Sequence, residues 1–402
     1  MTSFKIPLRY RLLNAALARA MKRNDSFLRF DPSAMQQKAI QETGLSDFGH
    51  LHYQEGLQAL ADSLENDSYL LPIGRSIANY IIANFLEHRL RFTESLKTQP
   101  EIYEAQLRPP LIVTGLARSG TSFLHRMLSV DPTHRALPQW QLMRPFPEGK
   151  GKDKRRKTMA RSLRFREPLV EGSDAIHYFR VDTPEECILP LGLTFNSLIF
   201  PTLLPAPGYL EWYLQNQDVK QKFIEYRQLL QFFQSEEPSR RLLMKTPAHT
   251  GNIGQIREAI PQAMFIQTHR EPITCVSSLC SLSYTFYQGQ SSYVDKNEIG
   301  RLDAELNEFW LRRNFAFREA NPGVIYDIDY RELVKDPLGT VRGIYTHYNL
   351  PWTQEYETAL HDFIHNNPKN KHGKHQYSPA EFGLDEGELK KRFRFYTEKM
   401  GL

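Results

Sequence analysis

The feature that most constrains the fold is a glycine-rich turn at residues 115–122, which read Gly-Leu-Ala-Arg-Ser-Gly-Thr-Ser. The short apolar run Leu111–Thr114 precedes it, and residues 119–130 follow with a helical pattern that ends at Asp131-Pro132. At such a junction of strand and helix, the first backbone N–H groups of the helix favour a bound anion. The spacing therefore predicts a phosphate-binding loop, and a chance glycine-rich turn is the weaker interpretation.

The residue types within this loop narrow the class of nucleotide. Thr121 occupies the place at which a nucleoside triphosphatase or kinase carries its phosphate-bridging lysine, and this argues against hydrolysis of ATP or GTP. Arg118 brings a fixed positive charge into the loop instead. We expect Arg118, Ser119, Gly120, Thr121 and Ser122 to contact the phosphate. The loop alone leaves the identity of the nucleotide open.

Further short apolar runs lie beside helical segments, at Leu242–Lys245, Met264–Gln267 and Val324–Asp327. Strands that alternate with helices predict an α/β fold, in which a P-loop-like parallel sheet is flanked by helices on both faces. We expect residues 1–105 to form a helical N-terminal region packed on an α/β domain at 106–402. An insertion at 140–240, rich in helix signals and aromatic residues, would shape a pocket beside the sheet.

The composition is that of a mildly basic globular protein, with 402 residues, 41% hydrophobic residues and a net charge of +5. A positive balance suits a polyanionic nucleotide, and no nucleic-acid partner is expected. The apolar stretches are too short to span a bilayer, and the N-terminus lacks a secretory pattern. Three cysteines form no CxxC pair, so we expect a reducing, cytoplasmic location.

Two basic segments leave alternatives open. Residues 6–21 place apolar side chains at helical spacing with arginines and a following lysine interleaved, which predicts a helix whose apolar stripe packs on the main domain. A basic amphipathic helix can also lie on an anionic membrane, so peripheral membrane contact is the alternative. Residues 150–166 carry nine Lys or Arg, a pattern typical of a solvated helix face, with an acidic acceptor or a membrane as the alternative contact.

A second anion site is predicted where the strand at Met264–Gln267 ends. Arg270 follows that strand, and Ser278 lies eight residues later on the next helix, so both side chains can converge on one group. A guanidinium and a hydroxyl suit a terminal phosphate. Taken alone, Arg270 could equally pair with a carboxylate. Together with the first loop, however, the pair indicates a nucleotide phosphorylated at its 5′ and 3′ positions.

These motifs resemble those of the sulfotransferases that use 3′-phosphoadenosine 5′-phosphosulfate (PAPS). Residues 115–122 resemble the family's 5′-phosphosulfate loop, and Arg270 with Ser278 resembles its 3′-phosphate motif. Lys245-Thr-Pro-Ala-His249 is similar to the K-[ST]-P-x-H segment of the bacterial-type family, and tyrosylprotein sulfotransferases have a comparable K-x-P. The resemblance implies a P-loop-like α/β fold, PAPS as donor, a hydroxyl-bearing acceptor and no catalytic metal.

Two C-terminal segments extend the resemblance. Residues 330–337 are similar to the family's Y-x-x-L-x-x-D-P segment, in which the tyrosine, here Tyr330, lies near the adenine. Residues 371–377 and 382–384 resemble the family's C-terminal loop, which implies that Lys374 and His375 contact the donor.

Sulfuryl transfer requires cations on the departing phosphate and a base for the acceptor's proton. We expect Lys245 to stabilise the leaving oxygen with Arg118 as its partner, the alternative being a surface lysine at a strand exit. Resemblance to the tyrosylprotein enzymes would place a glutamate base near position 141, where this chain has glutamine. The remaining candidates for the base are His177, His249 and the carboxylates of 185–186, including Glu186. A histidine is preferred because it titrates near neutral pH.

Two other functions remain open at this stage. A P-loop kinase for a small molecule would need a loop lysine and magnesium ligands, and Thr121 argues against the first. A nucleotide-binding regulatory protein without turnover gains modest support from Gln141, which cannot accept a proton at neutral pH.

Overall fold

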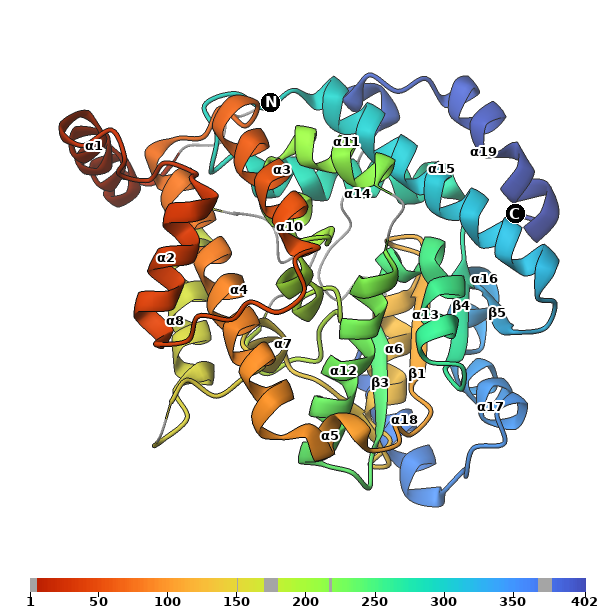
Figure 1. Ribbon diagram of the computed structural model, residues 1–402. Helices are drawn as coiled ribbons and strands as arrows, with labels where there is room; N and C mark the ends of the chain where they lie inside the picture. Colours follow the sequence, from red (N-terminus) through yellow and green to blue (C-terminus); the bar gives the residue numbers. More distant parts are fainter. Residues whose placement is uncertain (1–5, 150, 170–179, 217–218, 368–377) are drawn as a thin grey trace.

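The computed structural model describes residues 6–149, 151–169, 180–216, 219–367 and 378–402. Its centre is a parallel five-stranded sheet with the strand order β2-β3-β1-β4-β5 (Figure 1). The strands are β1 (Leu111–Gly115), β2 (His134–Ala136), β3 (Arg241–Lys245), β4 (Met264–His269) and β5 (Ile325–Asp329). The predicted α/β fold with a parallel sheet is therefore confirmed. Strand β2 was not predicted, because three residues that include a histidine and an arginine give no apolar run.

The strands are buried on both faces because their apolar side chains alternate between two hydrophobic clusters. On β1, Leu111 and Val113 belong to one cluster while Ile112 belongs to the other. The neighbouring strand β4 repeats the pattern, with Ile266 in the first cluster and Phe265 in the second. Helices on both sides cover these clusters, and because the strands are parallel, their carboxyl ends lie along one edge of the sheet.

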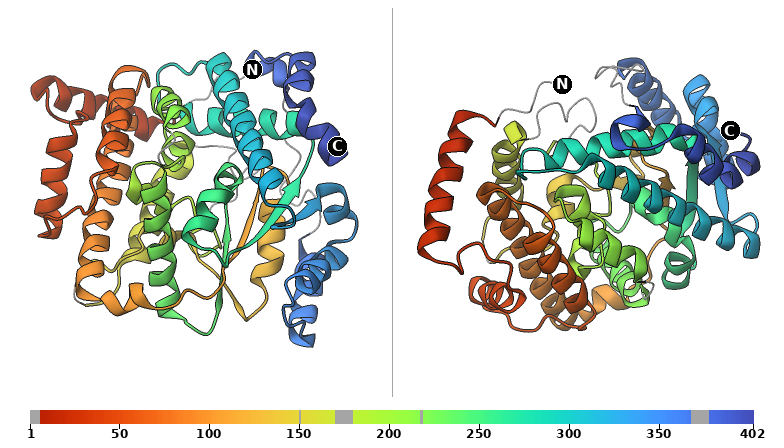
Figure 2. Two further views of the ribbon diagram at one scale, coloured as in Figure 1. Left: turned by 45° about the vertical axis from the view of Figure 1, so that its right-hand side comes forward. Right: turned by 90° about the horizontal axis from the view of Figure 1, so that it is seen from above.

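The first helices occupy the N-terminal hundred residues and pack on the later part of the chain. Helices α2 and α4 run side by side, and α3 packs against α11 of the central region (Figures 1 and 2). The bounds are α1 (Leu8–Arg23), α2 (Pro32–Thr43), α3 (Tyr53–Asn66), α4 (Pro72–Thr98) and α5 (Pro100–Glu104).

The central region lies between β1 and β4 and contributes the helices nearest the site. Its elements are α6 (Thr121–Ser129), α7 (Gln139–Met143), α8 (Arg155–Arg166), η1 (Glu167–Leu169), η2 (Pro190–Thr194), α10 (Ile199–Leu203), α11 (Pro207–Gln215), α12 (Lys220–Glu236), η3 (Pro247–Asn252) and α13 (Ile253–Ala259). Helix α6 packs on β1 and β3 from one side of the sheet, and α12 and η3 lie on the other.

The C-terminal part supplies two long helices that cross above the carboxyl edge of the sheet (Figure 1). They are α14 (Pro272–Tyr287) and α15 (Lys296–Ala320), which pack on each other. The remaining elements are α16 (Tyr330–Lys335), α17 (Pro337–His347), α18 (Gln354–Asn366), η4 (Pro379–Phe382) and α19 (Glu386–Met400). Because α14 and α15 face the central helices across the sheet edge, they close one wall of the site described below.

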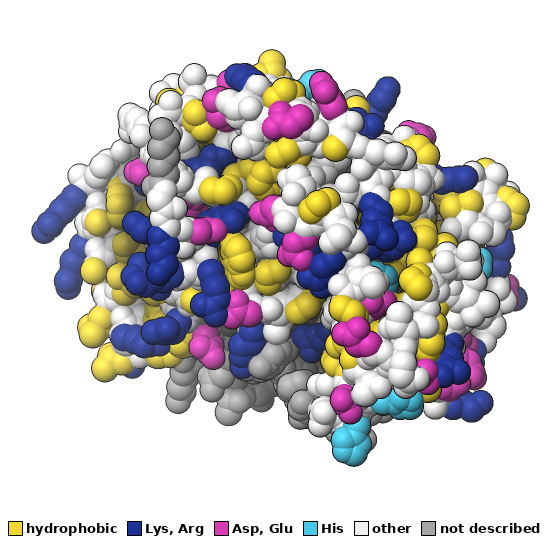
Figure 3. Space-filling view, turned by 90° about the horizontal axis from the view of Figure 1, so that it is seen from below, with side chains coloured by type: hydrophobic (Ala, Val, Ile, Leu, Met, Phe, Trp, Pro, Cys, Tyr) yellow, Lys and Arg dark blue, Asp and Glu magenta, His cyan; other side chains and the backbone are white. Residues whose placement is uncertain are grey.

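Helix α1 packs with only part of its apolar stripe. Tyr10 is buried and donates its hydroxyl to the Phe165 carbonyl of α8, whereas Leu8 and Leu12 are 62% and 65% exposed. Figure 3 shows Lys and Arg side chains, interspersed with hydrophobic ones, on the flank of the molecule at the left of that view. Among the described residues, no helix combines the length and the apolar character needed to cross a membrane.

Candidate active site

The loop between β1 and α6 has the backbone shape of an anion cradle. Gly115, Arg118 and Gly120 all have positive φ angles, of 134°, 69° and 96°. Gly120 is the N-cap residue of α6, and no side chain caps the first turn of that helix. The first amide N–H groups of α6 therefore lack an intrahelical acceptor and suit a phosphate. A Cβ at position 120 would lie 2.9 Å from the Tyr330 ring, so only glycine fits there.

Ser119 anchors this loop to the sheet. Its side chain is fully buried, donates to the Leu116 carbonyl at 2.6 Å and contacts the Thr268 hydroxyl of β4 at 2.6 Å. Ser122 by contrast is exposed at the start of α6. The backbone N–H of Ser119 also donates to the Leu116 carbonyl, at 3.1 Å, so of these two predicted phosphate ligands only Ser122 has an exposed hydroxyl.

The second predicted anion site meets the first at the ends of β4 and β5. Arg270 donates to the carbonyl of Arg118 at 2.7 Å, and its guanidinium stacks 4.3 Å from the centroid of the Tyr330 ring. The structure thus brings Arg118, Gly120, Arg270 and Tyr330 together. Ser278 lies on α14 and is 1% exposed, within the first two turns after Pro272. Lys374 and His375 lie outside the described residues.

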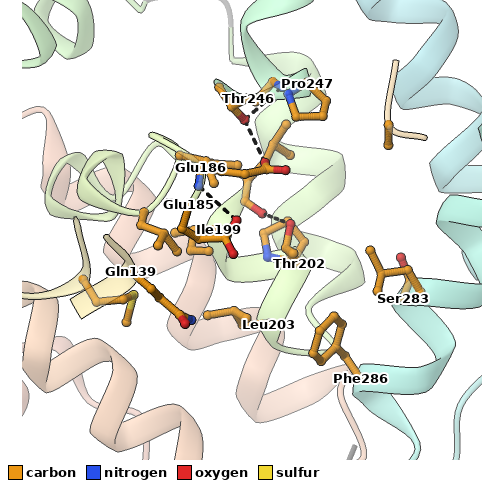
Figure 4. A pocket seen from close by; sticks show the side chains of 18 of the residues that line it. Gln139, Glu185, Glu186, Ile199, Thr202, Leu203, Thr246, Pro247, Ser283 and Phe286 are labelled. Atoms are coloured by element: carbon orange, nitrogen blue, oxygen red, sulfur yellow. Dashed lines mark hydrogen bonds between the residues drawn. The ribbon is translucent and has the colours of Figure 1, made fainter. Parts of the chain in front are cut away.

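Lys245 and Glu186 form an ion pair at the carboxyl end of β3. The ammonium donates to Glu186 Oε1 at 2.7 Å and to the hydroxyl of Ser122 at 3.1 Å. The second carboxylate oxygen of Glu186 accepts from Thr246 at 3.2 Å (Figure 4). Lys245 is buried, while the side chain of Glu186 is 20% exposed. The lysine therefore bridges the phosphate loop and a carboxylate that remains accessible.

Backbone pairing explains why Glu186, which is remote in sequence, reaches this point. The N–H of Cys187 donates to the Lys245 carbonyl at 3.0 Å, and the N–H of Glu185 donates to the Leu137 carbonyl at 3.1 Å. Glu186 lies between these two bonds, so the segment is fixed on both sides of it. Its position beside Lys245 is a consequence of folding that sequence spacing does not contain.

The structure does not bring His249 to the same place. His249 lies in η3, is 1% exposed, and its Nε2 is 3.3 Å from the Cys187 thiol. Burial, together with the nearby Lys222 ammonium, lowers the pKa of His249 to about 3. This buried, neutral imidazole is not among the described residues that line the cavity beside Glu186. His177, the other predicted histidine, lies outside the described residues.

A cavity of about 440 Å³ opens beside Glu186, with mostly apolar walls. Ala117 of the phosphate loop and Thr246 after β3 line its floor, and α10, α14 and α15 supply other walls. Figure 4 shows Glu186 and Thr246 across the cavity from Ser283 and Phe286. An apolar cavity with a few convergent polar groups is the usual form of a small-molecule site.

Glu185 and Asp303 also line this cavity; Glu185 was among the carboxylates considered for the base, whereas Asp303 was not predicted. Glu185 is 7% exposed and accepts from the Glu186 N–H at 3.0 Å. Asp303 lies on α15, within the apolar stripe that includes Leu302, Leu306 and Trp310. An acidic residue on the apolar face of an amphipathic helix is the signal that could have identified Asp303.

Comparison with known proteins assigns the family. A sequence profile of the sulfotransferase family matches residues 109–354, more than half of the chain, and the chain belongs to this family. Particular relatives are the omega-hydroxy-beta-dihydromenaquinone-9 sulfotransferases Stf3 of Mycobacterium bovis and Mycobacterium tuberculosis, 25% identical over 278 residues. The match covers 64% of this chain and 66% of those relatives, just under two-thirds of their length.

Solved structures extend the similarity to nearly the whole chain. The sulfotransferase STF9 from Mycobacterium avium has a TM-score of 0.82 and 26% identity, over 91% of this chain and 96% of that one. The sulfotransferase STF1 from Mycobacterium tuberculosis H37Rv has a TM-score of 0.74 and 28% identity, over 90% and 97%. The fold of this chain is therefore that of the mycobacterial sulfotransferases.

Proposed function

We propose that this protein transfers a sulfuryl group from PAPS to a hydroxyl group of an apolar acceptor. The observation that carries the proposal is the Lys245–Glu186 pair, which connects the phosphate loop at Ser122 to the apolar cavity. Membership of the sulfotransferase family supports the same reaction. A cation that faces the donor loop and a carboxylate that faces the acceptor cavity are the two groups the reaction requires.

The residues around the two anion sites fit the donor. The first-turn amides of α6, with Arg118, Thr121 and Ser122, would hold the 5′-phosphosulfate, and Arg270 with Ser278 would hold the 3′-phosphate. The Tyr330 ring beside Gly120 would lie near the adenine. PAPS supplies the sulfuryl group, and the nucleotide 5′-phosphate is the leaving group when the bond between sulfur and the phosphate oxygen breaks.

Glu186 is the base that the geometry favours. Its carboxylate lines the acceptor cavity and is held by Lys245 on one oxygen and Thr246 on the other. From this position it would accept the proton of the acceptor hydroxyl as the oxygen attacks the sulfur. Lys245 would remain beside Ser122 and stabilise the charge that develops on the departing oxygen. This assignment replaces the sequence-based preference for a histidine.

The acceptor class follows from the walls of the cavity. Leu163, Ile199, Leu203 and Phe286 are among its apolar lining residues, so an acceptor with a large apolar body would be stabilised there. The Stf3 relatives are named for an omega-hydroxylated dihydromenaquinone. We propose an apolar alcohol of this general kind, without a specific identity.

Contact with a membrane surface and a cytoplasmic location are part of this proposal. Exposed Leu8 and Leu12 on α1, with five Lys or Arg and no acidic residue on that helix, support binding to an anionic bilayer. Co-sedimentation with vesicles of phosphatidylserine and phosphatidylcholine should exceed that with phosphatidylcholine alone. Replacement of both leucines by serine should remove the difference, and equal sedimentation of all samples would contradict the contact.

Labelled donor provides the test of the reaction. The protein should transfer ³⁵S-sulfonate from PAPS to a long-chain alcohol in the presence of a chelator, because amides, arginines and Lys245 supply the positive field. The desulfated nucleotide should bind equally well with and without magnesium. A strict magnesium requirement, or transfer of ³²P from ATP, would contradict the proposal and favour a kinase.

A further inference from the structure

A buried carboxyl group lies in the wall of the acceptor cavity opposite the catalytic pair. Asp303 of α15 is 6% exposed and lines the cavity together with Leu306 and Trp310. It takes no part in the reaction outlined above. Carboxyl groups are seldom buried in apolar surroundings without a partner, so its presence in this wall requires an explanation.

The hydrogen bonds of Asp303 leave part of the carboxyl group available. Ser283 of α14 donates to Asp303 Oδ2 at 3.1 Å, and Ser283 is itself 7% exposed. Among the residues that the structure describes, no Lys, Arg or His forms an ion pair with Asp303. Burial raises the pKa of Asp303 to about 7, against the opposing effect of its bonds to Ser283 and Cys280. The carboxyl therefore has lone pairs that no described residue fills.

The space behind Asp303 has mixed walls that include several acidic side chains. A second cavity of about 50 Å³ adjoins the first, and Ser283 and Asp303 line both. Asp67, Asp295 and Glu298 also line the small cavity, so it presents hydrogen-bond acceptors and negative charge. A volume of this size accepts a small polar group or a few water molecules but no bulky substituent.

We propose that Asp303 and Ser283 form a subsite for a hydrogen-bond donor at the far end of an otherwise apolar acceptor. This inference rests on the proposed sulfotransferase function and specifies its substrate class: one hydroxyl reacts beside Glu186, and a second polar group binds at Asp303. A hydroxyl or an ammonium group can donate to the carboxylate. A carboxylate-ended acceptor is excluded, because like charges in an apolar cavity repel each other strongly.

The subsite is tested with alcohols of one chain length whose far end is a methyl, hydroxyl, ammonium or carboxylate group. Binding is measured by calorimetry in the presence of 3′,5′-adenosine bisphosphate, and transfer is measured with labelled PAPS. The wild-type Kd should be about tenfold or more lower for the hydroxyl- or ammonium-ended compound than for the methyl-ended one, since hydrogen bonds to charged groups are strong. The carboxylate-ended compound should bind most weakly.

Variants decide whether Asp303 is the cause. Asp303→Leu should abolish the preference for a donor-ended acceptor, and Ser283→Ala should reduce it. Thr202→Val is the matched control, because the Thr202 hydroxyl also lines the cavity but already donates to the Leu198 carbonyl at 2.7 Å. The control should leave the preference unchanged.

The two experiments separate the subsite from the reaction. A wild-type preference that is absent, or that survives in Asp303→Leu, would overturn the subsite even if sulfonate is transferred to the methyl-ended alcohol. Failure to transfer sulfonate to any acceptor would overturn the reaction, while the calorimetric preference and its loss in Asp303→Leu would still support the subsite. If the preference for the ammonium-ended compound grows as the pH rises through 7, the subsite binds an ammonium group. If the hydroxyl-ended compound is preferred at all pH values, the subsite binds a hydroxyl group.

Discussion

The ammonium group of Lys245 lies between the Glu186 carboxylate, at 2.7 Å, and the Ser122 hydroxyl, at 3.1 Å. One side chain therefore contacts both the helix start that would face the donor and the carboxylate that faces the acceptor cavity. Because Lys245 is buried, its charge is poorly screened by water and acts strongly on both neighbours. In the proposed reaction, this single cation would connect the donor loop with the group that activates the acceptor.

Lys245→Ala should slow the chemical step and leave donor affinity nearly unchanged, because the lysine acts on charge that develops in the transition state. We expect a loss of about 10²-fold or more, the usual effect of removing one such charge. Single-turnover transfer with pre-bound PAPS measures the step, and calorimetry measures donor affinity. An equal loss in both would show that Lys245 serves ground-state binding instead.

Arg270→Ala should weaken donor binding by about 2–4 kcal/mol, the range for removing one partner of a buried charged pair. The loss should be much smaller for adenosine 5′-phosphosulfate, which lacks the 3′-phosphate. Arg270 also holds the Arg118 carbonyl, so Arg270→Lys is the comparison that retains the charge. Equal losses for both nucleotides would mean that Arg270 does not recognise the 3′-phosphate.

His249→Gln should lower stability and leave the pH profile of transfer unchanged. The imidazole contacts the Tyr226 ring at a centroid distance of 5.0 Å, so we expect a cost of about 1–3 kcal/mol for the disturbed packing. Its pKa of about 3 keeps it neutral across the working range, so it cannot cause a rise in rate near neutral pH. Loss of that rise in His249→Gln would restore the histidine as the base.

Asp303→Asn should change how stability depends on pH. Burial raises the pKa of Asp303 from 3.8 to about 7, so the folded protein retains a proton that the unfolded chain releases. This stabilisation is complete at a pH below the pKa of Asp303 in the unfolded chain, and it is lost as the pH rises through about 7. Between low pH and a pH above 7, the free energy of unfolding of the variant should therefore rise by about 1–4 kcal/mol relative to that of the wild type. Urea unfolding across that range measures the difference, and parallel curves would contradict it.

The sequence was sufficient for those parts of the site that lie on one continuous segment. The strand at 111–115, the loop to Ser122 and the helix after it follow from local pattern and glycine placement, and the structure has them. Arg270 was also predicted, because it follows a strand and the carboxyl ends of parallel strands share one edge. Tyr330 was predicted from the resemblance of residues 330–337 to the family's segment.

The groups that depend on distant pairing could not be predicted in the same way. Glu186 reaches Lys245 because the Cys187 N–H pairs with the Lys245 carbonyl, 58 positions further along the chain, and no local pattern indicates that bond. Gln141 donates to Glu236 instead of lining the cavity, so its position in the sequence did not identify its surroundings. Asp303 enters the site only because α15 crosses the sheet edge.

The most direct test of the proposed reaction is single-turnover transfer of labelled sulfonate from PAPS by wild type and Glu186→Gln, measured across pH with a long-chain alcohol. We predict that the wild type transfers sulfonate in the presence of a chelator. In Glu186→Gln the rate of transfer should fall by ~10²–10⁴-fold, and the rate should no longer rise with pH on the acidic side. Unaltered rate and pH profile in Glu186→Gln would contradict the assignment of the base, and the absence of labelled product from the wild type would contradict the reaction itself.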